Sequence, residues 1–143
     1  MSLDQDLNNH LLQVLKETHL LSFSTQMAHW LTSGKTFYSW HAMYLEHYKD
    51  LTEMVDEIAE IILMFSGELT KDLQFYTFCA SDFPENSYDQ LDFLDNRHQI
   101  CVECLKLGVD MAESLDNQVI VDLLINHQAK HQKMIWFYKK LVA

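Results

Sequence analysis

Residues 37–67 read FYSWHAMYLEHYKDLTEMVDEIAEIILMFSG, and this stretch decides the fold. Its apolar and aromatic side chains recur at spacings of three or four, which is the pattern of one amphipathic helix. Thr36 is placed to cap the start of this helix, and Gly67 is placed to supply the left-handed residue after its end. The predicted core stripe consists of Phe37, Trp40, Tyr44, Leu51, Val55, Ile58, Ile62 and Phe65.

The residues before this stretch predict a partner helix over about residues 3–33, which Gly34 ends. The two helices would form an antiparallel hairpin. The stripe of the first helix consists of Leu7, Leu11, Val14, Thr18, Leu21, Thr25 and His29.

Two more helices are predicted downstream. Ser87 and Gln90 have the spacing of a capping box, which would start a helix running to about residue 115. Asp116 is placed to cap a last helix running towards Val142. Its stripe is mixed in character and includes Val119, Leu123, Leu124, His127 or Asn126, Lys130 and Met134.

Residues 68–86 break the helical periodicity and contain the only proline, Pro84. Thr70 is placed to cap a short helix through about Phe78. A connection of this length makes the second and third long helices parallel. We therefore expect residues 1–143 to form a single all-α domain, a four-helix bundle with a long crossover that carries a short helix.

Composition and charge exclude several functions. Three glycines and one proline are too few for a sandwich or a barrel, and no apolar run reaches the ~20 residues that cross a bilayer. Ten basic and 21 acidic residues give a net charge of −11, which repels nucleic acids and anionic lipids and attracts cations. Three cysteines and no basic N-terminal region favour a cytoplasmic protein.

Four side chains suggest a metal site. Asp56 and Glu60 are four residues apart, so their carboxylates project from one face of the helix. His29 and His41 flank the hairpin turn, so they should meet at one end of the bundle. Carboxylates and imidazoles together suit iron, zinc and manganese. Each residue alone would be read as a solvated or core-edge side chain, and only the combination favours a site.

One chain cannot bring these four residues together. His41 and Asp56 are fifteen residues apart on one helix, which places them about 22 Å from each other. Metal–ligand bonds are only about 2 Å long, so a second copy must supply the missing half of the site. A two-fold axis would create two identical sites, each with His29 and His41 of one subunit and Asp56 and Glu60 of its partner.

The sequence resembles the Dps family of miniferritins, which have a ferritin-like fold. The resemblance rests on His29-Trp30, Gly34, Phe37, His41 and the segment VDEIAE at residues 55–60, with DLL at residues 122–124 and KMIW at residues 133–136 supporting it. It implies a dodecamer with ferroxidase sites at its two-fold interfaces, to which His29, His41, Asp56 and Glu60 contribute. It also implies that two ferrous ions per site are oxidised, preferentially by hydrogen peroxide, and that ferric mineral is stored inside.

One position departs from the family pattern. The family usually has an acidic ligand four residues after the second histidine, where this chain has Leu45. We therefore expect a weakened second iron position. Two alternatives remain: an oligomeric shell or partner-binding protein with impaired ferroxidase activity, and a DNA-protecting protein. The charge and the absence of a basic stretch before Lys16 argue against DNA binding.

Overall fold

The computed structural model describes residues 2–77 and 81–143 and contains five helices and no strand within those ranges. The four long helices are α1 (Gln5–Leu31), α2 (Phe37–Met64), α4 (Ser87–Ser114) and α5 (Gln118–Leu141), and α3 (Leu73–Thr77) is short. The prediction of an all-α bundle with a short helix in the crossover is confirmed. Phe78, the predicted end of that short helix, lies outside the described residues.

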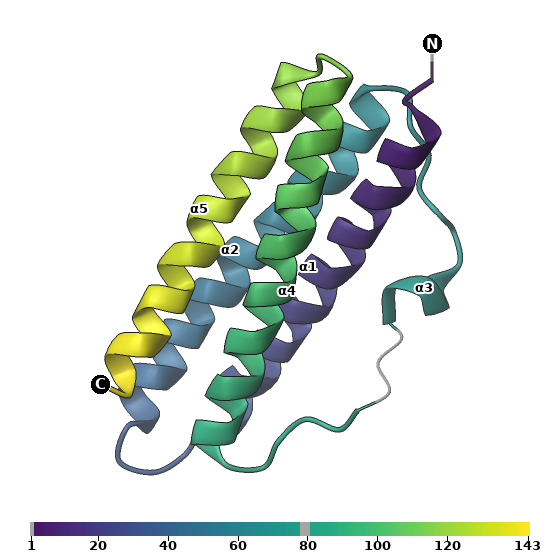
Figure 1. Cartoon of the computed structure of the whole chain (residues 1–143). Coiled ribbons are helices and arrows are strands. Elements are labelled where there is room, and N and C mark those ends of the chain that lie inside the picture. Colours follow the sequence, from purple (N-terminus) through teal and green to yellow (C-terminus); the bar gives the residue numbers. More distant parts are fainter. Residues whose placement is uncertain (1, 78–80) are drawn as a thin grey trace.

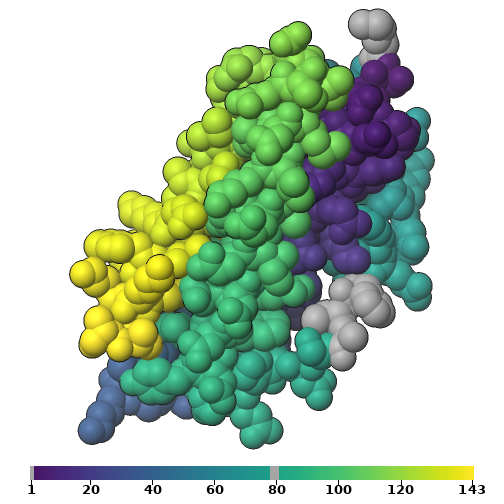
Figure 2. All heavy atoms as spheres, viewed as in Figure 1, coloured from purple at the N-terminus to yellow at the C-terminus, as the bar shows by residue number. Residues whose placement is uncertain are grey.

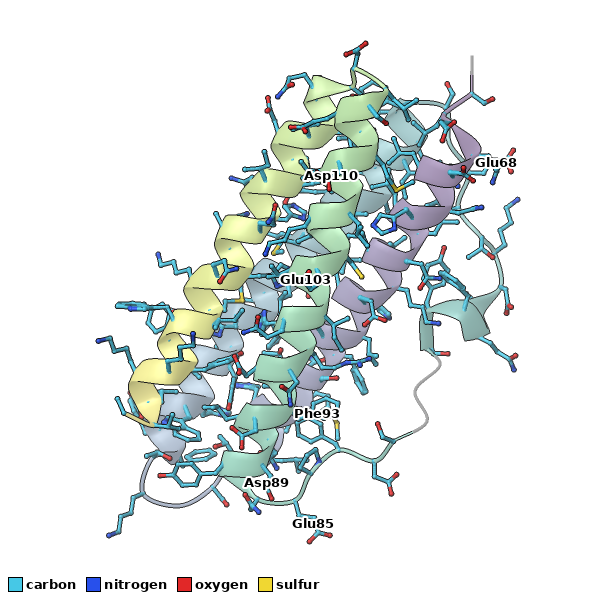
Figure 3. The ribbon with its side chains drawn as sticks, viewed as in Figure 1. Glu68, Glu85, Asp89, Phe93, Glu103 and Asp110 are labelled. Carbon is cyan, nitrogen blue, oxygen red and sulfur yellow. The ribbon has the colours of Figure 1, made fainter. Side chains whose placement is uncertain are left out.

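The crossover places α2 and α4 parallel to each other, as predicted (Figure 1). It leaves the end of α2 beside the N-terminal end of α1 and runs along the outside of the bundle to the start of α4. Figure 3 marks this path, with Glu68 near one end of the molecule and Glu85 and Asp89 at the other. The turn between α1 and α2 therefore lies at the same end of the bundle as the start of α4.

The core forms two apolar clusters along the bundle. One contains Leu7, Leu11, Ile58, Ile62, Leu105 and Leu124, and the other contains Leu21, Trp40, Tyr44, Leu51, Leu94 and Tyr138, among others. All four long helices contribute to each cluster, so neither hairpin completes its core alone. In the view of Figure 2, α4 and α5 form the face towards the reader and cover most of α2.

Two predicted helix caps are wrong by one residue. The Asn86 side chain accepts from the Asp89 amide, so α4 is capped by Asn86 rather than Ser87. The hydroxyl of Ser87 instead accepts from the amide of Ser33 at 2.9 Å, which ties the start of α4 to the hairpin turn. At the start of α5, Asn117 accepts from the amide of Ile120 and takes the capping role predicted for Asp116.

Details of α2 and the crossover also differ from the predictions. Thr36 occupies the N-cap position of α2 but makes no side-chain capping bond. The left-handed residue after α2 is Ser66, with φ 61°, and not Gly67. In the crossover, Asp72 accepts from the amide of Gln74 where α3 begins, so Thr70 is not its cap.

The predicted stripe of α5 is displaced by about one residue. Val119 is 55% exposed, and Ile120 and Val121 fill the core in its place. Further along the helix His131 is fully buried, where the prediction placed Lys130. Because α5 carries polar residues on several faces, apolar spacing alone did not select the buried one.

Asn8 joins the crossover to α1 with a pair of hydrogen bonds. Its Nδ2 donates to the carbonyl oxygen of Glu68 at 3.1 Å, and its Oδ1 accepts from the amide of the same residue at 2.8 Å. Asn8 is 6% exposed, so these bonds satisfy an amide that would be costly to bury unpaired. Gly67 lies directly against this pair.

Gly67→Ala should destabilise the protein by about 1–3 kcal/mol. A Cβ at this position would overlap Oδ1 of Asn8 and would stand 2.9 Å from the carbonyl oxygen of Ile62. Urea unfolding followed by circular dichroism measures the change. Glu68→Gln is the control, because it alters only an exposed side chain beside the same backbone bonds. Equal midpoints for the two variants would contradict the prediction.

Candidate metal centre

The two histidines meet across the hairpin, one turn of helix from its loop. The rings of His29 and His41 stack with centroids 3.8 Å apart and planes 15° from parallel. Nδ1 of His29 lies 2.7 Å from the carbonyl oxygen of His41, and Nδ1 of His41 lies 2.6 Å from the carbonyl oxygen of His29. Each imidazole is therefore held by the backbone of the opposite helix.

These reciprocal bonds fix which ring nitrogen carries the hydrogen in each neutral imidazole. A carbonyl oxygen only accepts hydrogen bonds, so each Nδ1 must carry the hydrogen. In the neutral rings each Nε2 then carries a lone pair, which is the state that binds a metal ion. Phe37 stacks on the other side of His41 at 4.8 Å, and Tyr48 lies beside His29 at 5.7 Å. The nitrogen donors are thus held in position before any metal binds.

The two carboxylates form a second pair further along α2. Asp56 and Glu60 are both exposed, whereas Glu57 between them contacts α5 through His127, with Oε1 3.3 Å from Nε2. The intervening acid therefore faces another helix, and among residues 2–77 and 81–143 no ion pair involves Asp56 or Glu60. Two carboxylates one turn apart provide hard oxygen ligands for a cation.

The structure does not bring the two pairs together within a chain. Both lie on or against α2, and His41 and Asp56 are fifteen positions apart, or about 22 Å along the helix. Across residues 2–77 and 81–143, no three side chains from His, Cys, Asp and Glu converge on a metal-sized position. Within the described part of one chain, neither pair is joined by a third candidate ligand.

An apolar groove runs beside the acidic pair. It has a volume of about 990 Å³ and lies between α1, the last turns of α2 and the crossover. Val55, Ala59 and Leu63 line it from α2, in alternation with Asp56 and Glu60 along the helix. Leu63 is 54% exposed. The residues that line it from the other segments are Leu15, His19, Gly67, Glu68, Leu69, Thr70, Lys71, Leu73, Tyr76 and Thr77.

Leu45 is half-buried on α2, one turn after His41. No carboxylate occupies the position where the family pattern places one, so the histidine half-site offers two nitrogen donors and an aliphatic side chain. The nitrogen side of the site is therefore less polar than the resemblance implies.

Sequence analysis missed a set of buried histidines inside the bundle. His47, His98, His127 and His131 are each at most 5% exposed, and they come from α2, α4 and α5. His127 and His131 are one turn apart on α5, which was the available signal in the sequence. The contacts between these histidines depend on the fold.

The two described cysteines lie on α4 and pack towards the core. Cys101 is buried and Cys104 half-buried, and neither forms a disulfide in the described part of the chain. Burial raises the pKa of both thiols, with Glu17 adding to the effect, so the reactive thiolate is disfavoured.

Comparison with known proteins assigns the family. A model of the ferritin-like domain matches residues 8–143, and the chain belongs to the ferritin-like family. Its fold is that of Dps proteins. It superimposes on Dps from Thermosynechococcus elongatus with a TM-score of 0.90 at 21% identity, over 97% of this chain and 91% of that one. Dps from Staphylococcus aureus gives 0.90 at 22% identity, over 100% and 99%.

Curated relatives have low sequence identity to this chain. A low temperature-induced protein of Nostoc is 28% identical over 96% of this chain and 80% of its own length. DNA protection during starvation protein 2 of Bacillus anthracis is 24% identical over 78% and 79%. A Dps structure from Vibrio cholerae is 23% identical over 97% of this chain and 90% of that one, with a TM-score of 0.86, and is described as a ferritin-like diiron-carboxylate protein.

Every helix in the described residues is too short or too polar to span a bilayer.

Proposed function

We propose that this protein oxidises ferrous iron at sites shared between two subunits and stores the ferric product inside a hollow oligomer. The observation that carries the proposal is the paired geometry of His29 and His41, whose reciprocal bonds to backbone carbonyls leave both Nε2 atoms as metal donors. Asp56 and Glu60 of the partner subunit complete the site. Membership of the ferritin-like family supports the same function.

The ligand chemistry suits iron as the substrate. Imidazole nitrogens and carboxylate oxygens bind ferrous iron while leaving coordination positions open for an oxidant. Hydrogen peroxide takes one electron from each of two ferrous ions and two protons from solvent, and is reduced to water. Because both electrons leave in one site, hydroxyl radical is not released. Zinc or manganese would suit the same donors and would compete with iron.

The oligomer is part of the proposal. Two half-sites per chain require at least a dimer, and an isologous contact completes both at once. The exposed apolar groove beside Asp56 and Glu60 offers the partner an apolar surface next to the ligands. By family resemblance we propose a dodecamer acting in the cytoplasm under oxidative stress. A net charge of −11 per chain disfavours DNA as a partner.

Leu45 supports a second candidate, an oligomeric shell that has lost turnover. Without a carboxylate after His41, the second iron at each site has fewer ligands. The two candidates differ in what the purified protein does with iron.

The test is to add ferrous iron anaerobically and then hydrogen peroxide, following ferric absorbance and the peroxide consumed. The ferroxidase candidate predicts two ferrous ions oxidised per peroxide and a mineral core that elutes with the oligomer in size-exclusion chromatography. The inactive shell predicts oxidation at the rate of buffer alone and no retained iron.

Leu45→Asp should raise tightly bound ferrous iron from about one towards two ions per site and speed the first turnover by severalfold. The new carboxylate would supply the ligand that the second position lacks. Anaerobic titration calorimetry and stopped-flow absorbance measure the two effects. Leu45→Asn is the control, since asparagine has the same shape as aspartate without its charge. An unchanged stoichiometry in Leu45→Asp would contradict the prediction.

A further inference from the structure

A connected set of buried polar side chains crosses the bundle and uses none of the proposed iron ligands. His47, His98, His131 and Tyr138 are each at most 5% exposed, and we name them the core network. Nδ1 of His98 lies 2.8 Å from Nδ1 of His131. The Tyr138 hydroxyl lies 3.4 Å from Nε2 of His98 and 3.4 Å from Nδ1 of His47. The network joins α2, α4 and α5.

All four members are neutral at neutral pH. Burial lowers the pKa of His47 to about 4 and that of His131 to about 3. Burial, with His131 and His47 as neighbours, also holds the pKa of His98 well below its usual 6.5. Burial raises the pKa of Tyr138 well above 10, so the phenol keeps its hydrogen. The network therefore exists as three imidazoles and one hydroxyl.

The contacts limit how many protons the network can hold. Its three links, His131 to His98, His98 to Tyr138 and Tyr138 to His47, each require one hydrogen between the two atoms. The three neutral imidazoles and the phenol carry one hydrogen each, four in all. Three of these hydrogens occupy the links, and the fourth lies on Nε2 of either His131 or His47, the two ends of the network. One further proton fits on the nitrogen at the other end. A second further proton would place two hydrogens in one link, which breaks that contact.

One carboxylate, Asp95 of α4, lies close enough to the core network for its charge to act on Tyr138. Among the described residues, no carboxylate makes a hydrogen bond or ion pair with the network. On α5, His127 is paired with Glu57 of α2, and Lys130 lies near it. Asp95 is also close to Lys139, and burial raises its pKa, so both reduce the negative charge that it presents to the network. α1 contributes the apolar side chains of Leu21 and Ala28 to the core cluster that contains Tyr138. Its Glu17 is paired with Arg97 of α4.

Water has a route to one end of the network. A groove of about 300 Å³ between α2 and α5 reaches His47. Its walls carry charges of both signs, so they provide no net anion for a protonated imidazole. The residues that line the groove are Glu46, His47, Asp50, Lys130, Lys133, Met134 and Phe137.

We propose that the core network is a pH-sensitive device that stabilises the subunit at neutral pH and releases α2 from α4 and α5 in mildly acidic solution. Histidines in the unfolded chain titrate near pH 6.5, above their values in the fold. The unfolded state therefore binds more protons, and the stabilisation that is complete above pH 6.5 declines as the pH falls below it.

The test is urea unfolding of the full-length protein at fixed concentration from pH 8 to pH 4.5, followed by circular dichroism. Each histidine that is protonated only on unfolding raises the unfolding constant about tenfold for each pH unit by which the pH falls. With three network histidines, the unfolding constant should therefore rise by about a thousandfold for each pH unit by which the pH falls near pH 5. Above pH 7 it should not change with pH. His131→Asn should reduce the slope by about one proton, to roughly a hundredfold.

Two controls separate titration from packing. Tyr138→Phe removes the hydroxyl links but keeps the three histidines, so the unfolding constant should rise at every pH with the slope retained. His19→Asn removes a histidine outside the network and should leave the slope unchanged. A His131→Asn slope equal to that of the unsubstituted protein would overturn the proposal. If that variant does not fold, the unsubstituted protein decides: a slope of two protons or more supports the proposal, and a smaller one overturns it.

Discussion

Asp56→Asn combined with Glu60→Gln should slow ferrous iron oxidation by about a hundredfold, while the fold and the oligomer stay intact. Both side chains are exposed, so their replacement leaves no buried group unpaired. Loss of both charged oxygen donors removes half of the proposed ligand set, and two imidazoles alone bind ferrous iron weakly. Stopped-flow absorbance after peroxide addition measures the rate.

The matched control neutralises two exposed carboxylates elsewhere. Asp92→Asn with Glu103→Gln changes the net charge by the same amount on α4 and breaks only a surface ion pair with Lys106. Its oxidation rate should remain within about twofold of the unsubstituted protein. If both double variants slow oxidation equally, the acidic surface as a whole attracts iron and the proposed site is wrong.

Mixing two inactive variants should restore activity. One variant carries His29→Ala and His41→Ala, and the other carries Asp56→Asn and Glu60→Gln. In a mixed dimer, one of the two sites joins intact histidines to intact carboxylates, and the other site lacks both. Random pairing makes about half of the dimers mixed, so about a quarter of the sites are complete. From almost no activity in either parent, the oxidation rate should rise to about a quarter of normal.

This recovery requires that subunits exchange, so the variants are unfolded together in urea and refolded as a mixture. The same treatment of each parent alone provides the baseline. A site built within one chain predicts no recovery, because each chain of the mixture remains defective. Absence of recovery, with mixed oligomers demonstrated by differently tagged chains, would therefore exclude the shared site.

The helices and their order could be predicted from the sequence because apolar spacing reports burial directly. The exact caps could not. Asn86 and Ser87 are both good capping residues, and the choice was made by the bond between Ser87 and Ser33 on another segment. On α5, a buried imidazole such as His131 satisfies one of its ring nitrogens on His98 of α4. A pattern within one helix does not contain that partner.

The candidate site was predictable to a similar degree. Counting residues through the hairpin predicts that His29 and His41 are neighbours, and the rise of a helix predicts that Asp56 is too far away to join them. The reciprocal bonds to backbone carbonyls, which fix both Nδ1 hydrogens, required coordinates. The interface that would join the two pairs depends on a second molecule, and it stays a prediction.

The reciprocal pairing of His29 and His41 also constrains the loop between their helices. Both bonds need α1 and α2 to keep their present rotation and height, and residues 32–36 form the loop that joins the two helices. Inserting one residue early in α2 would turn the following ring by about 100° and shift it by about 1.5 Å. Apart from Gly34, whose φ of 94° strains any side chain, and the buried Thr32, this loop should therefore tolerate exchange of its side chains far better than any change in its length.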